Sequence, residues 1–287
     1  MLTSPELPVA RKEIPCVDLL CPWRIVRHLR GHGSLIQQLT KRDILARYRG
    51  SFLGAFWSLL RPLGMLTVYA VVFGFIFQSR LGQGANESKL DFTLALFCGL
   101  VLFDFLGESL SRAPMLVLAN PNYVTKVVFP LEILSVSAVG AALIQMLISF
   151  IPLLAALLAA HGTIPLTALY LPLVVLPLIL LALGLSWFLS SLGVFIRDIN
   201  AIVPVALTIL MFASAIFYSL NRVPPQFQTL FLFNPIALVV HEARNILLWG
   251  ISPSWGRLAL LWVASFLVAV SGYAFFMRTK RAFADVM

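Results

Sequence analysis

Long apolar stretches recur along most of the chain and are separated by short polar connections. A helix that crosses the hydrocarbon core of a bilayer needs ~20 largely apolar residues, and six stretches of about that length occur. The pattern therefore predicts an all-α integral membrane protein with six transmembrane helices. The predicted spans cover, approximately, residues 56–79, 92–111, 133–160, 168–193, 201–220 and 257–277.

The segment before the first span has a different pattern. Residues 1–33 are polar and contain four prolines, which is typical of a loosely ordered lead-in. In residues 34–50, apolar side chains such as Leu45 fall on one helical face, while lysines and arginines supply positive charge. This pattern predicts an amphipathic helix in the membrane interface at the start of a transmembrane domain at 34–287.

A seventh apolar stretch, at 225–249, differs from the six spans. It contains Asn234 followed by Pro235, and then His241, Glu242 and Arg244. A charged side chain at the centre of the bilayer costs at least ~2.5–3.5 kcal/mol on insertion scales. We therefore expect an outer-face, re-entrant helical segment that packs on protein or faces water. His241 and Glu242 also resemble an acid–base pair, but a partly exposed outer-face helix is the preferred interpretation, because no third positioned group is evident.

Composition and charge support the membrane prediction. Hydrophobic residues make up 60% of the 287 residues and charged residues 11%, whereas soluble domains average about 45–50% and 25%. The net charge of +9 accompanies no basic stripe interleaved with aromatics, so nucleic acid is not an expected partner. Alternate connections hold 16 and 5 of the 21 lysines and arginines. The positive-inside rule therefore predicts a multi-pass protein of the bacterial inner membrane with both termini in the cytoplasm.

The sequence offers little catalytic chemistry. The phosphate-binding loop G-x-x-x-x-G-K-[ST] does not occur, so any ATP and Mg²⁺ are expected to be bound by another subunit. The chain itself is expected to hold no cofactor and not to be an enzyme. The spacing of Cys16, Cys21 and Cys98 suggests neither a disulfide framework nor a zinc site, and no metal is predicted.

Three charged residues of the second span share one helical face, because Asp104, Glu108 and Arg112 are four residues apart. They could form a proton relay. The preferred interpretation is a set of inner-leaflet charges that Arg112 or a neighbouring helix neutralises.

An aromatic stripe follows the first span, where Tyr69, Phe73 and Phe77 recur every four residues, after Phe56 and Trp57 at its start. Aromatic rings stack on the apolar faces of sugars, so a carbohydrate path could use this stripe. Packing between helices explains the same pattern, and both interpretations remain open.

Several motifs occur in a fixed order along the chain. LTKRDILARYRGSFLGAFW precedes the first span, LANPNYVTKVVFPLEIL follows the second, and FIRDINAIVPV, SAIFYSLNRVP and FNPIALVVHEARNILL come later. In these motifs, from about residue 36 to the end, the chain resembles the permease subunits of ABC transporters that export O-antigen, capsule or teichoic-acid chains. One departure is Ala215, where the family often has proline.

The resemblance implies a homodimer that works with two copies of a separate cytoplasmic ATPase subunit and exports a lipid-linked polysaccharide. It also implies a coupling loop at 112–131 that contacts the ATPase, although from the residues alone a plain connector is the preferred interpretation of this loop. The coupling contact is expected at Asn120, Pro121, Asn122, Tyr123 and Lys126.

Two further groups of residues follow from this resemblance. We expect Arg42, Arg47, Tyr48, Arg49 and Trp57 at the cytoplasmic entrance, where the arginines would meet the pyrophosphate and headgroups of lipids. The translocation path is expected to include Phe56, Tyr69, Phe73, Phe77 and Tyr218. Three alternatives remain: a membrane enzyme of glycolipid synthesis, a proton-driven transporter, and an exporter of a smaller lipid or drug.

Overall fold

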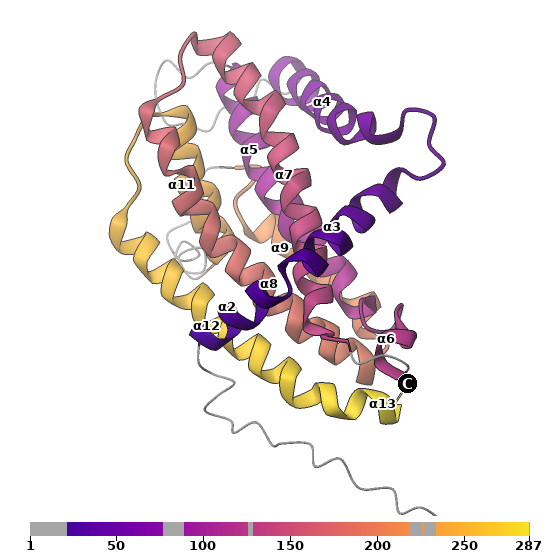
Figure 1. Ribbon diagram of the computed structural model, residues 1–287. Helices are drawn as coiled ribbons and strands as arrows, with labels where there is room; N and C mark the ends of the chain where they lie inside the picture. The colour runs from indigo at the N-terminus through magenta and orange to yellow at the C-terminus, as the bar shows by residue number, and fades with distance from the viewer. Residues whose placement is uncertain (1–21, 77–88, 126–128, 219–225, 227–233, 287) are drawn as a thin grey trace, which may run out of the picture.

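The computed structural model describes residues 22–76, 89–125, 129–218, 226 and 234–286, and every regular element among them is a helix (Figure 1). Five helical stretches within these residues are long and apolar enough to cross a membrane. They are Gly54–Phe73, Leu90–Met115, Glu132–His161, Leu166–Phe195 and Trp255–Val286. Each overlaps one predicted span, so an all-helical membrane protein is confirmed.

The bundle is built around α5 (Lys89–Arg112), which packs against α7 (Glu132–His161), α8 (Leu171–Phe195) and α11 (Pro235–Leu248). Of its most apolar 18 residues, 78% are buried inside the protein. The corresponding share is 39% for α7 and for the stretch that contains α8. Because α5 is enclosed by other helices, it forms the core of the molecule.

Helix α8 also packs closely against α12 (Trp255–Thr279). A Cβ atom on Gly272 would lie 2.1 Å from the backbone oxygen of Gly184, and one on Gly184 would lie 2.4 Å from that of Val268. Small residues let helix backbones approach closely in membrane proteins. The glycines therefore set the distance between these helices.

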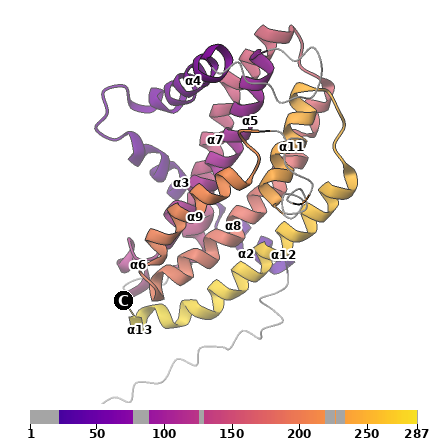
Figure 2. The same ribbon diagram turned by 180° about the vertical axis from the view of Figure 1, so that it is seen from behind.

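The first predicted span is divided in the structure. A short turn, η1 (Gly54–Phe56), leads into α4 (Trp57–Tyr69), which continues as a π-helix, η2 (Ala70–Ile76). Residues 77–79 lie outside the described residues. Only 6% of this apolar stretch is buried, and the loop before α4 projects from the side of the bundle (Figures 1 and 2). The first span therefore leaves most of its surface open.

The predicted span 201–220 is longer than the helix observed there. Helix α9 (Ile199–Ala213) has 15 residues, and the backbone then leaves the helical conformation, with a φ of 51° at Ala215. A sixth crossing therefore stays a prediction.

The segment before the bundle differs from the prediction for 1–33. Its described part forms α2 (Pro22–Gly31), and α3 (Gly33–Tyr48) follows within the bounds expected for the interfacial helix. Ile25 and Leu29 pack against a second core cluster that includes Trp187. This tertiary packing, which the prolines gave no reason to expect, accounts for the order of α2.

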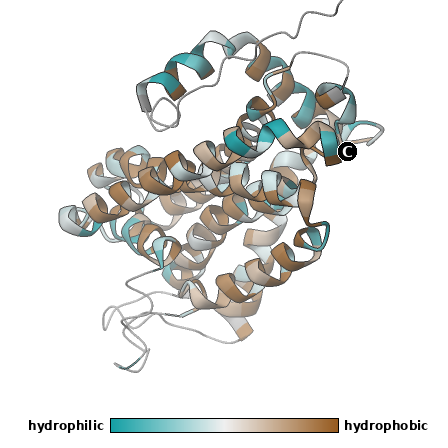
Figure 3. Ribbon diagram, turned by 90° about the horizontal axis from the view of Figure 1, so that it is seen from below, coloured by the Kyte–Doolittle hydropathy of each residue, from teal (hydrophilic) through white to brown (hydrophobic). Residues whose placement is uncertain are grey.

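The second core cluster is formed mainly by residues of α3, α7, α8, α12 and the short α13 (Phe283–Val286), which follows η6 (Lys280–Ala282). The short α6 (Pro121–Thr125) lies beside α13 in both ribbon views (Figures 1 and 2). We call this part of the molecule the α6 end. Seen from below, the helices of the bundle are mainly hydrophobic (Figure 3).

Candidate functional site

The loop between α5 and α7 forms a defined structure at the α6 end. The side chain of Asn120 donates from Nδ2 to the backbone oxygen of Leu116 at 2.9 Å. The backbone oxygen of Asn120 accepts from the backbone N–H of Tyr123 at 3.1 Å. Asn120 thus closes one turn and opens α6. Pro121 and Asn122 are exposed, while Lys126 lies outside the described residues. The loop presents a short, solvent-accessible helix.

Tyr123 connects this loop to α3. Its ring stacks on Phe129 with a centroid distance of 4.3 Å. Its hydroxyl oxygen accepts a hydrogen bond from Nη1 of Arg42 at 3.1 Å. One of the three arginines expected at the entrance therefore contacts the loop that is expected to couple to the ATPase.

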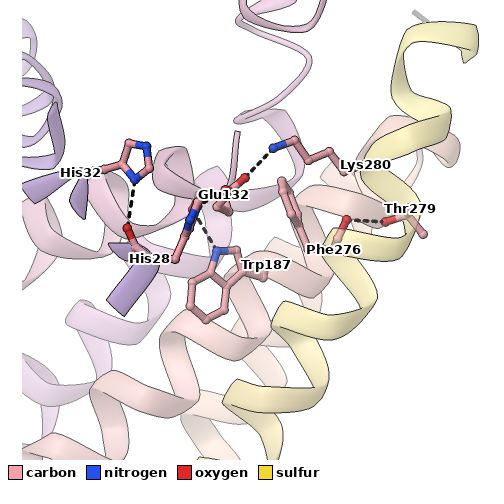
Figure 4. A network of polar contacts seen from close by, with 7 residues as sticks. All are labelled: His28, His32, Glu132, Trp187, Phe276, Thr279 and Lys280. Carbon is pink, nitrogen blue, oxygen red and sulfur yellow. Dashed lines mark hydrogen bonds and ion pairs between the residues drawn. The ribbon is translucent and has the colours of Figure 1, made fainter. Parts of the chain in front are cut away.

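Glu132 fixes the residues that follow the loop (Figure 4). Its carboxylate is buried, with Oε1 at 2.6 Å from Nε2 of His28 and Oε2 at 2.7 Å from Nζ of Lys280. Its backbone oxygen accepts from the indole N–H of Trp187 at 2.9 Å. A buried carboxylate needs such partners, because removal from water is costly. Glu132 thus joins α7 to α2, α8 and η6.

The other two expected entrance arginines point to different surroundings. Arg47 forms an ion pair with Glu108 of α5, whereas Arg49 is exposed just after the end of α3. The three arginines therefore do not converge on one site in this conformation. Glu108 is neutralised by α3, a neighbouring helix, and Asp104 stays exposed within the subunit.

Tyr48 and Trp57, the remaining expected entrance residues, lie on either side of the loop between α3 and α4. Tyr48 donates its hydroxyl hydrogen to Oε1 of Gln145 at 3.1 Å, and Nε2 of Gln145 donates to the backbone oxygen of Ser58 at 2.9 Å. Trp57 is exposed. Gln145 thus holds both ends of the loop against α7.

The expected path residues are separated by the fold. Phe56 is exposed, but Tyr69 and Phe73 are partly buried against the core, with Phe73 at a ring distance of 5.9 Å from Phe92. Tyr218 donates from its hydroxyl to the backbone oxygen of Phe212 at 2.6 Å, and Phe77 lies outside the described residues. In the free subunit, Tyr69 and Phe73 serve helix packing.

Among the described residues, several helices expose apolar side chains, including α7, α12, α9 and the first span. On α9, Ile202, Val205, Ile209 and Phe212 are all more than half exposed. The first span exposes a similar row at Leu63, Met65, Val68 and Val71. In a membrane, these surfaces contact either lipid or another protein chain.

Comparison with known sequences shows which family has this arrangement. The sequence profile described as ABC-2 type transporter matches residues 34–248, from the beginning of α3 to the end of α11. The chain belongs to the ABC-2 type transporter family.

Relatives with assigned roles are similar to this ABC-2 type transporter over most of their length. An O-antigen export system permease protein of Myxococcus xanthus is 31% identical, over 70% of this chain and 74% of that protein. One from Klebsiella pneumoniae is 24% identical, over 88% and 95%. The polysialic acid transport protein KpsM of Escherichia coli is 25% identical, over 75% and 81%.

The region shared by the ABC-2 family contains Glu132 but not His28 or Lys280. In the sequence analysis, Glu132 appears only as part of the motif LANPNYVTKVVFPLEIL. Both of its partners were missed, and so was Gln145. A buried acid at the first turn of a span was the one available signal, since such a charge needs partners. Nothing in the sequence indicated which residues these would be.

The predicted outer-face segment of this ABC-2 protein includes α11, whose residues are largely buried. The Oε2 atom of Glu242 accepts from the backbone N–H of Ser254 at 3.1 Å, and its Oε1 atom lies 3.3 Å from Nη2 of Arg257. Burial lowers the pKa of His241 below its ordinary value, which favours the neutral ring. Among the described residues, no cluster of three His, Cys, Asp or Glu side chains could hold a metal ion. Glu242 thus has a structural role.

Proposed function

We propose that this chain is the membrane subunit of an ATP-driven exporter that moves lipid-linked polysaccharide across the bacterial inner membrane. The match to the ABC-2 family over α3 to α11 carries this proposal. The names of the relatives, which are O-antigen export permeases and a polysialic acid transport protein, indicate the class of cargo. A cytoplasmic ATP-binding subunit supplies the energy.

The functional unit is a homodimer with two ATP-binding subunits. The surfaces of α4 and α9 are the ones chosen for this assembly, because these two helices bury little of their surface within the subunit. If two copies meet at these surfaces, the path lies between them, and Phe56 and Tyr218 are near it. In this assembly the apolar α9 forms the sixth crossing together with the residues that flank it, α11 lies at the outer face, and both termini are in the cytoplasm.

The α6 helix is the contact for the ATPase. Pro121 and Asn122 are exposed, and the adjacent Tyr123 connects α6 to α3 through Arg42. Force applied to α6 would therefore reach the interfacial helix. At the entrance, Arg49 is the arginine best placed for the lipid pyrophosphate, while Arg47 would reach it after releasing Glu108.

Deletion of this chain followed by analysis of lipid-linked glycans tests the proposed function. Export is supported if finished polymer accumulates on the cytoplasmic side and the purified chain carries an ATPase subunit. Loss of polymer with intact precursors would instead favour a membrane enzyme. Normal glycan export would favour a smaller lipid or drug as cargo.

The entrance is tested separately with Arg49→Gln and Arg47→Gln. We expect both variants to insert and bind the ATPase, and to export less polymer, because each loses a cation for the phosphate groups. Arg281→Gln, an exposed arginine at the α6 end, is the control. Undiminished export in both entrance variants would remove the arginines from the mechanism.

A further inference from the structure

The carboxyl end of α9 has an unusual backbone. The helix ends at Ala213, and the following residues form a break in which Ala215 has a φ of 51°. Non-glycine residues seldom adopt this left-handed conformation. The last carbonyl groups of a helix have no partners within it, so other donors have to satisfy them here.

Asn234 supplies the first donor. Its Nδ2 atom donates to the backbone oxygen of Ala213 at 3.0 Å and to Oγ of Ser214 at 3.1 Å. Its Oδ1 atom accepts from the backbone N–H groups of Ile236 at 3.0 Å and Ala237 at 3.4 Å. One side chain thus caps the end of α9 and the start of α11.

Arg244, further along α11, donates to the backbone of the break itself. Nη1 donates to the backbone oxygen of Ala215 at 3.1 Å, and Nη2 to that of Ile216 at 2.7 Å. Nε donates to the backbone oxygen of Ala95 on α5 at 2.8 Å. The guanidinium therefore binds the break on one side and α5 on the other.

The surroundings of Arg244 are adapted to its side chain. It is only 5% exposed, and its hydrogen-bond acceptors among the described residues are backbone oxygens rather than a carboxylate. A Cβ atom on Gly99 of α5 would lie 2.9 Å from Nη2, so glycine makes room for the guanidinium. Burial lowers the pKa of Arg244 to about 10, so the group stays charged at neutral pH.

Packing alone does not explain a charged side chain here, because an apolar side chain of similar volume often stabilises a protein equally well or better. Helix α9 buries few of its own side chains, among them Val203, and exposes Ile209 and Phe212. With so little packing in the subunit, the position of its carboxyl end depends on the hydrogen bonds from α11.

We propose that Asn234 and Arg244 are positioning residues that fix the end of α9, and with it Tyr218, relative to α5 during export. This inference rests on the proposed function, in which α9 borders the path between two subunits. The ATPase-driven movement of α9 would then carry α11 with it, so the break at Ala215 moves as one unit with the outer-face helix.

The test uses the complex with its ATPase subunit in lipid nanodiscs and in cells. Arg244→Lys keeps the charge but loses the planar group that reaches three carbonyls. Gly99→Ala leaves Arg244 in the sequence but displaces its guanidinium. This variant therefore tests the inference if Arg244→Lys does not fold. Asn245→Ala is the matched control, because Asn245 is also buried on α11 but, among the described residues, its side chain hydrogen-bonds to His241, at 3.3 Å, and not to the break.

The first measurement is the polymer exported per ATP hydrolysed, at equal amounts of assembled complex. We expect Arg244→Lys and Asn234→Ala to lower this ratio by about tenfold, the effect of losing one or two charge-assisted or capping hydrogen bonds. Asn245→Ala is expected to leave it unchanged. A merely structural role would lower the amount of complex but not the ratio, and that result would overturn the inference.

The second measurement does not depend on cargo. Spin labels are placed at the exposed positions Thr208 and Ile251, and they report the distance from α9 to the residues after α11. The three cysteines of the chain are replaced beforehand, and labelled subunits are diluted with unlabelled ones. A wider distance distribution in Arg244→Lys or Gly99→Ala supports the inference, and an unchanged distribution in both overturns it. If the wild type exports no polysaccharide, the proposed function fails, but the distances still test the positioning role.

Discussion

Glu132 and Arg244 are buried charges that solve the same problem in different ways. Glu132 is neutralised by two cationic or protonatable side chains from segments far away in the sequence. Arg244 is held by three backbone carbonyl groups. Both connect segments that would otherwise have few contacts, one at each end of the bundle.

Replacing Glu132 with Gln tests its role at the α6 end. The amide retains the shape but not the charge that binds His28 and Lys280, so we expect the free energy of unfolding to fall by about 1–3 kcal/mol. Thermal unfolding of the purified protein measures the change. Asp285→Asn, an exposed acid at the same end, is the control, and an equal loss in both variants would contradict a specific role for Glu132.

Two substitutions at Ala215 are expected to change the free energy of unfolding in opposite directions. Proline fixes φ near −65° and cannot adopt the observed 51°, so Ala215→Pro is expected to lower the free energy of unfolding by about 3 kcal/mol. Glycine adopts positive φ without strain, and Ala215→Gly should raise it by up to about 1 kcal/mol.

Thermal unfolding of both variants measures these changes. Ala206→Gly, at an exposed position within α9, is the control, and it should lose about 1 kcal/mol because glycine is unfavourable in a helix. A stabilising proline would show that the break has another conformation. The proline that the family often has at this position would then be compatible with this chain as well.

At the scale of elements, the contact between α8 and α12 depends on two glycines. Gly184→Ala places a methyl group against the backbone of α12, and we expect a loss of about 1–3 kcal/mol in the free energy of unfolding from overpacking. Gly64→Ala is the matched control, since open space surrounds Gly64 on α4. Protease resistance and thermal unfolding are measured for both variants, Gly184→Ala and Gly64→Ala. Equal stability would show that the helices can move apart at no cost.

The sequence predicted elements better than it predicted their partners. Apolar length alone located five of the spans, because a lipid-facing helix has to be apolar along its whole length. The early end of α9 could not be predicted in this way. The break that follows it is bound by Arg244, which lies 29 residues after Ala215, and a hydropathy pattern contains no information on such tertiary contacts.

The candidate site was predicted less completely for a similar reason. A helix was predicted over 34–50 and one is observed at Gly33–Tyr48, and the arginines of this segment were grouped by their shared helix. In the structure Arg42 reaches Tyr123, Arg47 reaches Glu108, and Arg49 stays exposed. Helical periodicity gives the face on which a side chain lies, but the partner depends on which neighbouring helix covers that face.

At the scale of the whole molecule, the proposed dimer makes a specific prediction for α9. A cysteine at Ile209, which is 65% exposed, is expected to form a disulfide with the same position of a second copy or react with a short bifunctional linker in native membranes. Leu267→Cys on α12, at an exposed position of 61%, is the control. Equal cross-linking at both positions would indicate random collision in the bilayer.

The bond between Glu132 and Lys280 also has a consequence for biosynthesis. Lys280 leaves the ribosome 148 residues after Glu132, when the helices before it have already been made. Until then the buried carboxylate lacks one of its cations, and the start of α7 is incompletely held. A chain truncated before Lys280 is therefore expected to hold the start of α7 less firmly than the full sequence does.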